Sequence, residues 1–166
     1  MKKFLIYFGS GLVLIISLIG IAWLGSSETP AVPISTNTSN SVLNVDTEYY
    51  NFGTISMDAG NVNHTFRMTN RGTVPVTITK MFTSCMCTRA TLKTADGTVG
   101  PYGMPGHGSI PRIDKIILPG ETADINVVFD PAAHGPAGIG PIQRAVILEN
   151  DAGRSIEVTF KALVTP

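Results

Sequence analysis

The sequence is poor in cysteine and in charge, and each scarcity limits what the protein can do. Only two of the 166 residues are cysteine, so any thiol chemistry must involve this one pair. Charged residues make up 14% of the chain, and its 12 basic and 12 acidic side chains give a formal net charge of zero. Because no basic cluster occurs beyond the first three positions, we expect no nucleic-acid partner.

Charged side chains are missing altogether from residues 4–24. A helix of about 20 apolar residues spans a bilayer, whereas a secretory signal has an apolar region of about 7 to 15 residues before a small-x-small cleavage site. The exit, residues 23–28, has no clear Ala-x-Ala and no cysteine for lipid attachment. We therefore predict a membrane anchor at 1–25, with a cleaved signal peptide as the alternative. Lys2 and Lys3 predict that the rest of the chain lies outside the cytoplasm.

No segment after residue 24 has a helical period. By composition, the chain beyond that point has two parts. Residues 26–41 are rich in Pro, Ser, Thr and Asn and are predicted to be a flexible linker. Residues 42–166 alternate short β-branched and aromatic runs with turn residues, which predicts one all-β sandwich domain. Strands are expected at 42–45, 49–55, 61–69, 74–82, 113–118, 122–129, 144–148 and 155–164.

The core is expected to form from the apolar faces of these strands. In 61–69, alternation places Val62, His64, Phe66 and Met68 on one face, so His64 is read as an inner-face residue rather than a ligand. The predicted core residues are Phe52, Phe66, Ile78, Ile117, Val127, Phe129, Val146, Ile156, Val158 and Phe160.

An ordered set of motifs runs through this domain. It consists of Asn51-Phe52-Gly53-Thr54-Ile55, His64-x-Phe66-x-x-x-Asn70-x-Gly72-x-x-Pro75-x-x-Ile78, Ser84-Cys85-x-Cys87-Thr88, Pro119-Gly120-Glu121 and Phe129-Asp130. Over residues 45–164 the set resembles the bacterial family known as domain of unknown function 1573. The resemblance implies an immunoglobulin-like sandwich of the sperm-protein and Hydin type, usually exported or membrane-anchored, and it implies no established activity. The chain departs from the family at Met86, where glycine is usual, and in the longer segment 96–112.

Cys85 and Cys87 are separated by Met86, and the backbone conformation decides what they can do. In an extended strand both sulfurs leave on one face with alpha carbons about 6.6 Å apart, whereas in a tight turn all three sulfur atoms could converge into a soft site suited to Cu(I). An oxidising compartment favours a disulfide instead, although its three-residue loop would contribute only about 1.6 kcal/mol. A structural pair, a soft-metal site and a thiol-exchange site all remain open.

Further candidate ligands lie in Tyr102-Gly103-Met104-Pro105-Gly106-His107-Gly108. If this loop folds over the cysteines, Met104 and His107 could complete a copper site, while the same composition is typical of an ordinary surface loop. The metal-site hypothesis therefore names Cys85, Cys87, Met86, Met104 and His107. Apart from Cu(I), no cofactor is expected. His134 is expected in an exposed loop.

Catalytic signatures are missing. No motif ties any of the three histidines to a cysteine, as a cysteine hydrolase would require. The carboxylates flank predicted strands at turn positions, and 135–140 is expected to be a hairpin or bulged crossover rather than a phosphate-binding loop. We therefore expect a non-enzymatic binding module with an envelope protein as partner and no identified small-molecule substrate. The alternative is a soft-metal or thiol-redox module centred on the cysteine pair.

Overall fold

The computed structural model describes residues 42–106 and 110–166, and these residues form strands and two short 3-10 helices. The strands are β1 (Leu43–Val45), β2 (Tyr49–Ser56), β3 (Val62–Asn70), β4 (Val76–Thr83), β5 (Thr88–Thr94), β6 (Gly97–Tyr102), β7 (Lys115–Ile117), β8 (Thr122–Phe129), β9 (Gly140–Asn150) and β10 (Ile156–Thr165). The 3-10 helices are η1 (Met57–Ala59) and η2 (Gly135–Gly138).

Three predictions fall on residues that the structure leaves undescribed: the anchor at 1–25, the linker at 26–41 and the ligand His107. They stay predictions. Within 42–106 and 110–166, no helix has the length and apolar character needed to cross a membrane.

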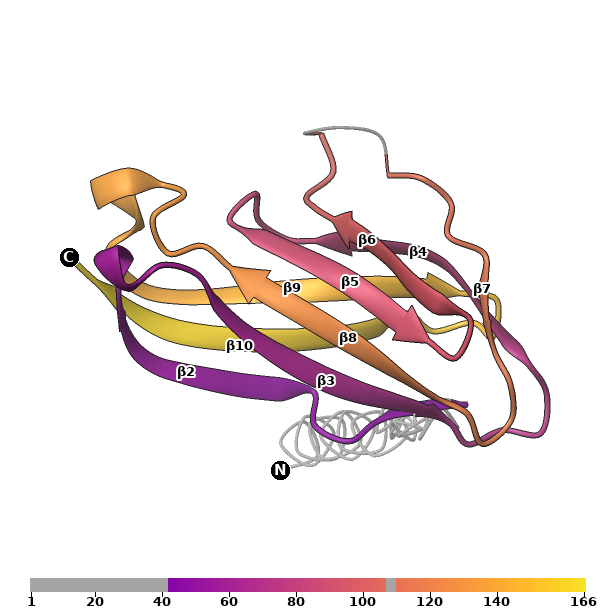
Figure 1. The fold of residues 1–166 in the computed structure, drawn as a ribbon. Helices are drawn as coiled ribbons and strands as arrows, with labels where there is room; N and C mark the ends of the chain where they lie inside the picture. Colours follow the sequence, from indigo (N-terminus) through magenta and orange to yellow (C-terminus); the bar gives the residue numbers. More distant parts are fainter. Residues whose placement is uncertain (1–41, 107–109) are drawn as a thin grey trace, which may run out of the picture. The chain divides into compact units, whose positions relative to one another are not determined.

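The strands form two sheets that face each other as layers (Figure 1). The first sheet has the order β1-β3-β8-β5-β6 and the second has the order β2-β10-β9-β4-β7. The described pairs are antiparallel except β2, which runs parallel to β10. The prediction of an all-β sandwich is thus confirmed. The orders β1-β3-β8-β5 and β10-β9-β4 match the two sheets of an immunoglobulin domain, with β2, β6 and β7 added at the edges.

The core lies between the sheets and is built from the inward positions of the alternating strands. Met68, Ile125 and Val127 of the first sheet and Ile78 and Val158 of the second are fully buried. Nine of the ten predicted core residues are buried, and Phe52 is partly buried against the core. Because a fully buried large apolar side chain contributes about 1.5 to 3 kcal/mol, this layer is the main stabilising element.

β4 shifts its inward face halfway along, which the sequence did not predict. Alternation from Val76 and Ile78 would place Lys80 inside, but a register shift between Ile78 and Lys80 reverses the pattern. As a result Lys80 is exposed beside Glu149, at 3.0 Å, and Met81 is buried. The same shift turns the hydroxyl of Thr83 inward, beneath the segment that carries the cysteines.

β5 and β6 were not predicted from the sequence, and β9 is longer than the predicted strand at 144–148. β5 alternates buried and outward residues, but its buried positions include two threonines, so its apolar signal is weak. β6 contains Gly100 and Pro101, residues typical of turns. β9 begins at Gly140 rather than Arg144. Of the two expectations for 135–140, the hairpin is wrong and a crossover is found, because 135–138 form η2 within the connection from β8 of the first sheet to β9 of the second.

Asn70 explains one part of the motif set. It lies at the end of β3, is fully buried, and its Nδ2 donates to the carbonyl oxygens of Val74 and Ile117 at 2.9 and 2.8 Å. Its Oδ1 accepts a hydrogen bond from the backbone N–H of Gly72 at 2.9 Å. One side chain thus joins the end of β3 in the first sheet to the end of β7 in the second and to the loop before β4.

Candidate functional site

The two cysteines occupy a turn where the chain passes from one sheet to the other. β4 of the second sheet ends at Thr83, and β5 of the first begins at Thr88. The N–H of Thr88 donates to the carbonyl of Cys85 at 3.1 Å, which closes the turn. The hydroxyl of Thr83 lies 2.9 Å from the same carbonyl and 3.1 Å from that of Thr88. The bulge in β4 turns the Thr83 side chain inward, and its hydroxyl thereby holds the two ends of the turn through the carbonyls of Cys85 and Thr88.

Cys85 and Cys87 are joined by a disulfide bond, with their alpha carbons 5.2 Å apart. Of the two conformations considered from the sequence, the turn is correct and the extended strand is wrong. Both cysteines are buried, at 7% and 2% exposure. Because the bond closes a loop of only three residues, it constrains the unfolded chain by about 1.6 kcal/mol. The sandwich core supplies much more, so the bond is a poor structural staple.

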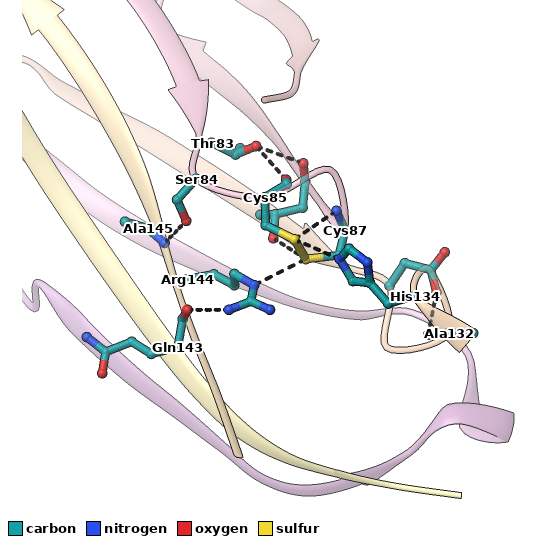
Figure 2. The surroundings of a disulfide bond; sticks show 11 residues. Thr83, Ser84, Cys85, Cys87, Ala132, His134, Gln143, Arg144 and Ala145 are labelled. Atoms are coloured by element: carbon teal, nitrogen blue, oxygen red, sulfur yellow. Dashed lines mark hydrogen bonds between the residues drawn. A yellow bond between two sulfur atoms is a disulfide. The ribbon is translucent and has the colours of Figure 1, made fainter. Parts of the chain in front are cut away.

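A histidine and an arginine lie beside the disulfide (Figure 2). The Nε2 atom of His134 is 3.2 Å from Cys85 Sγ, and the Nε of Arg144 donates to Cys87 Sγ at 3.4 Å. Arg144 also donates from Nη1 to the carbonyl of Gln143 at 2.8 Å, which holds the guanidinium against the sulfur. No motif in the sequence ties His134 to either cysteine, so this contact was not predicted.

The fold brings His134 to this place through the connection between β8 and β9, which crosses between the sheets as the cysteine turn does. The N–H of Asp130 donates to the carbonyl of Cys87 at 2.9 Å and ties the two connections together. The carboxylate of Asp130 then accepts from the N–H of Ala132 at 2.9 Å, which starts the tight turn leading to His134. His134 is exposed, as predicted, but its ring faces the sulfur of Cys85.

The predicted metal ligands are only partly brought together. Met86 is at the turn between the cysteines, and its side chain is about half exposed, at 47%. Met104 is half-buried just after β6. The residue before it, Gly103, accepts a hydrogen bond from the N–H of Thr83 at 3.1 Å, so the chain at Met104 passes near the base of the cysteine turn.

The side chains around the disulfide permit two kinds of chemistry. The ligand atoms of Cys85, Cys87 and His134 all lie within 4.8 Å of one another, which is the compactness of a metal site. Equally, a cationic side chain beside a cysteine favours its thiolate, the form that attacks disulfides. Arg144 is such a cation, and it contacts Cys87. Neither His134 nor Arg144 was predicted to belong to this site.

Comparisons with solved structures show the fold alone. A protein of unknown function from Porphyromonas gingivalis W83 is similar with a TM-score of 0.55 and 14% identity, over 74% of this chain and 46% of that one. A family 123 glycoside hydrolase from Clostridium perfringens, whose structure details glycolipid glycan hydrolysis, is similar with a TM-score of 0.50 and 8% identity, over 70% of this chain and 22% of that one. This chain thus spans less than half of each structure. None of the curated proteins compared matches it.

Comparison with family models addresses the predicted resemblance directly. The matching model is described as "Protein of unknown function (DUF1573)" and covers residues 43–101, from β1 through most of β6. The matched segment contains the cysteine turn and Asn70, whereas His134 and Arg144 lie beyond it. The predicted resemblance is confirmed over residues 43–101, which match this family model.

Proposed function

We propose that the protein is a membrane-anchored, extracytoplasmic, immunoglobulin-like module that binds another envelope protein and is not an enzyme. Residues 4–24 would hold it in the membrane as a single span, and 26–41 would separate the sandwich from the lipid. The disulfide supports this location, because such bonds persist mainly outside the reducing cytoplasm.

The observation that carries the binding proposal is the edge strand β2. Among the described residues β2 pairs only with β10, so the other side of an eight-residue strand is open within that part of the chain. An open edge accepts an extended segment of a partner through backbone hydrogen bonds. Tyr49 and Tyr50 at the start of the strand are 41% and 36% exposed, and tyrosine is a frequent anchor at interfaces.

Ring contacts hold this edge in one conformation. Tyr50 stacks on His64 with ring centroids 3.6 Å apart, and Phe52 contacts Phe160 edge to face at 5.4 Å. A preorganised edge loses little conformational entropy on binding. A surface hollow lies next to it, lined in part by Tyr49 and Arg154, and offers a place for a partner side chain.

Photocrosslinking in intact membranes tests this proposal. We would replace Tyr49 with a photoreactive phenylalanine analogue and, as a control, place the same analogue at the exposed Thr98 on the β6 edge. We expect a discrete crosslinked envelope protein from position 49 only. Tyr49→Lys should abolish a complex captured through a tag, because a charge protects an edge strand, while Val74→Lys at a 58%-exposed site should not. Equal capture by both variants would refute the edge as the binding site.

The anchor is tested separately from the binding edge. Extraction of membranes at high pH should leave the chain in the pellet, and intact mass should include residues 1–25. Protease added to the extracytoplasmic face should digest the sandwich, while protease on the cytoplasmic face should not. Release by alkali with a mass that begins after residue 25 would establish a cleaved signal instead.

A second candidate function is thiol exchange at the Cys85–Cys87 pair, and the contact of Arg144 with Cys87 favours it. On reduction, the guanidinium would stabilise the Cys87 thiolate, which would attack a disulfide of a partner protein and form a mixed disulfide. Cys85 would resolve that bond, leaving the partner reduced and this pair oxidised. A Cys85→Ser variant should trap the mixed disulfide, and Cys87→Ser should not. Trapping by neither variant would exclude exchange.

A further inference from the structure

We propose that reduction of the Cys85–Cys87 bond opens a Cu(I) site with three protein ligands: Cys85 Sγ, Cys87 Sγ and His134 Nε2. The inference shares with the thiol-exchange candidate the requirement that the bond be reducible, and it is independent of the binding edge on β2. His134 is used here in place of Met86, whose side chain is 47% exposed. Met104 is half-buried, and His107 lies outside the described residues.

Geometry is the first support. The three ligand atoms lie within 4.8 Å of one another, and Cys85 Sγ is 3.2 Å from His134 Nε2, so one ion can be shared by all three after a small displacement. The turn and the β8–β9 connection that carry them are joined by the hydrogen bond from Asp130 to Cys87 at 2.9 Å. The ligands therefore come from two connections held in fixed positions.

The donor set selects the metal. Two thiolates and one imidazole are soft and borderline ligands, and the cluster contains no carboxylate that would favour a hard cation. Three ligands suit the low coordination of Cu(I), whereas structural Zn²⁺ almost always takes four.

Charge balance points the same way. Two thiolates, a neutral imidazole and Cu(I) carry one net negative charge, and Arg144 supplies one positive charge at 3.4 Å from Cys87 Sγ. With Zn²⁺ the same ligands would be neutral and the guanidinium would lack a counter-charge. Because a half-buried cation is costly without one, Cu(I) fits this surrounding better.

Reduction of the disulfide and binding of the metal are two separate steps. A dithiol reductant gives two electrons and two protons to the Cys85–Cys87 bond, which breaks into two thiols while the reductant forms its own disulfide. Cu(I) then displaces both thiol protons to solvent and accepts a lone pair from each sulfur and from Nε2 of His134. Oxidation of the pair reverses the first step and removes two ligands, so the oxidised protein should not hold the metal.

The test uses the full chain in detergent under anaerobic conditions. A water-soluble phosphine replaces the dithiol as reductant, because dithiols bind copper themselves; it takes oxygen from water as the two thiols form, and it is removed before titration. Intact mass should rise by the two added hydrogens of the pair. Competition with bicinchoninate for Cu(I) should then give one ion per reduced chain and none per oxidised chain. X-ray absorption should show two sulfur neighbours and one nitrogen neighbour.

Variants assign the ligands. His134→Ala should weaken Cu(I) binding at least tenfold and remove the nitrogen neighbour, while His64→Ala, which alters a histidine stacked on Tyr50, should leave the affinity unchanged. Cys85→Ser with Cys87→Ser should abolish binding. Arg144→Gln should weaken it by about tenfold, as for a residue that contacts a ligand, and Arg144→Lys should restore most of the affinity. Circular dichroism of each variant establishes that the sandwich is folded.

Several outcomes would overturn the proposal. They are a bond that the phosphine does not reduce, a reduced chain that takes up no copper, equal copper uptake by the oxidised chain, or an affinity unaffected by His134→Ala. Preference for Zn²⁺ over Cu(I) in direct competition would overturn the choice of metal. Crosslinking through Tyr49 is a separate readout, so failure here and failure of the binding proposal can be distinguished.

Discussion

Replacement of Asn70 by alanine should be among the most destabilising polar substitutions in the sandwich. The side chain is fully buried and makes three hydrogen bonds, to Gly72, Val74 and Ile117, at 2.8 to 2.9 Å. A net contribution of about 0.5 to 1.5 kcal/mol for each bond gives a loss of about 3 kcal/mol. For a domain of this size about 4 °C is lost per kcal/mol, so we expect the melting temperature to fall by about 12 °C.

Urea and thermal unfolding followed by circular dichroism measure this loss, and Asn126 provides the matched control. Its Nδ2 donates to Thr65 Oγ1 at 3.1 Å in an exposed position, so Asn126→Ala should cost less than about 0.5 kcal/mol. The reasoning fails if Asn70→Ala costs no more than Asn126→Ala. Asn70→Asp sharpens the test, because it keeps the acceptor for Gly72 but sets a carboxylate against two carbonyl oxygens. Its folded-state pKa should be raised, and its stability should fall as the pH rises from 4 to 7.

Three further predictions follow from the described contacts. The N–H of Thr77 donates to Asp151 at 2.8 Å and lowers the pKa of that carboxyl. Stability that is present at neutral pH should therefore be lost as the pH falls through the folded-state pKa. Asp151→Asn should remove this loss when unfolding is measured between pH 6 and 3. Burial lowers the pKa of His64 and favours the neutral ring that stacks on Tyr50. The free energy of unfolding should therefore fall as the pH drops below about 6.5. A His64→Gln variant whose unfolding free energy kept the same dependence on pH would contradict this assignment. Gly100 has φ +109°, a backbone conformation that side chains disfavour, so Gly100→Ala should lower the free energy of unfolding by about 1 to 3 kcal/mol. An unchanged free energy in urea unfolding would show that a side chain causes no strain at this position.

The sandwich was predictable because its core strands alternate strongly. In β3, β8 and β10 the apolar residues recur at every second position. β3 and β8 pair in the first sheet and β10 lies in the second, so both layers of the core carried a clear signal. β5 escaped prediction because Thr88 and Thr94 occupy buried positions where an apolar residue would have given the signal. The reversal of face in β4 also escaped, since a bulge depends on pairing with β9 and leaves no mark in the periodicity.

The cysteine pair was predictable as a candidate site, but its conformation and its neighbours were not. His134 is 49 residues from Cys85 in sequence, and the two meet because Thr88 pairs with Phe129 across β5 and β8. That register places the residues before β5 beside those after β8. Since β5 itself was not predicted, no argument from the sequence could bring the histidine to the sulfur.

Arg144 differs, because the sequence did contain a signal for it. Val146 and Leu148 are inward positions of β9, and alternation carries the same face back to Arg144 at the predicted start of that strand. An arginine on the inward face needs an electron-rich partner, because an unpaired half-buried cation is costly. In the structure the Nε of Arg144 contacts Cys87 Sγ at 3.4 Å. That sulfur is an uncharged and weak acceptor while the disulfide is intact, and it becomes a counter-charge as a thiolate. The guanidinium is thus placed to stabilise negative charge on sulfur, whether a free thiolate or a thiolate bound to Cu(I). The Arg144→Lys variant, which keeps the charge, therefore distinguishes this electrostatic role from simple packing of the arginine side chain.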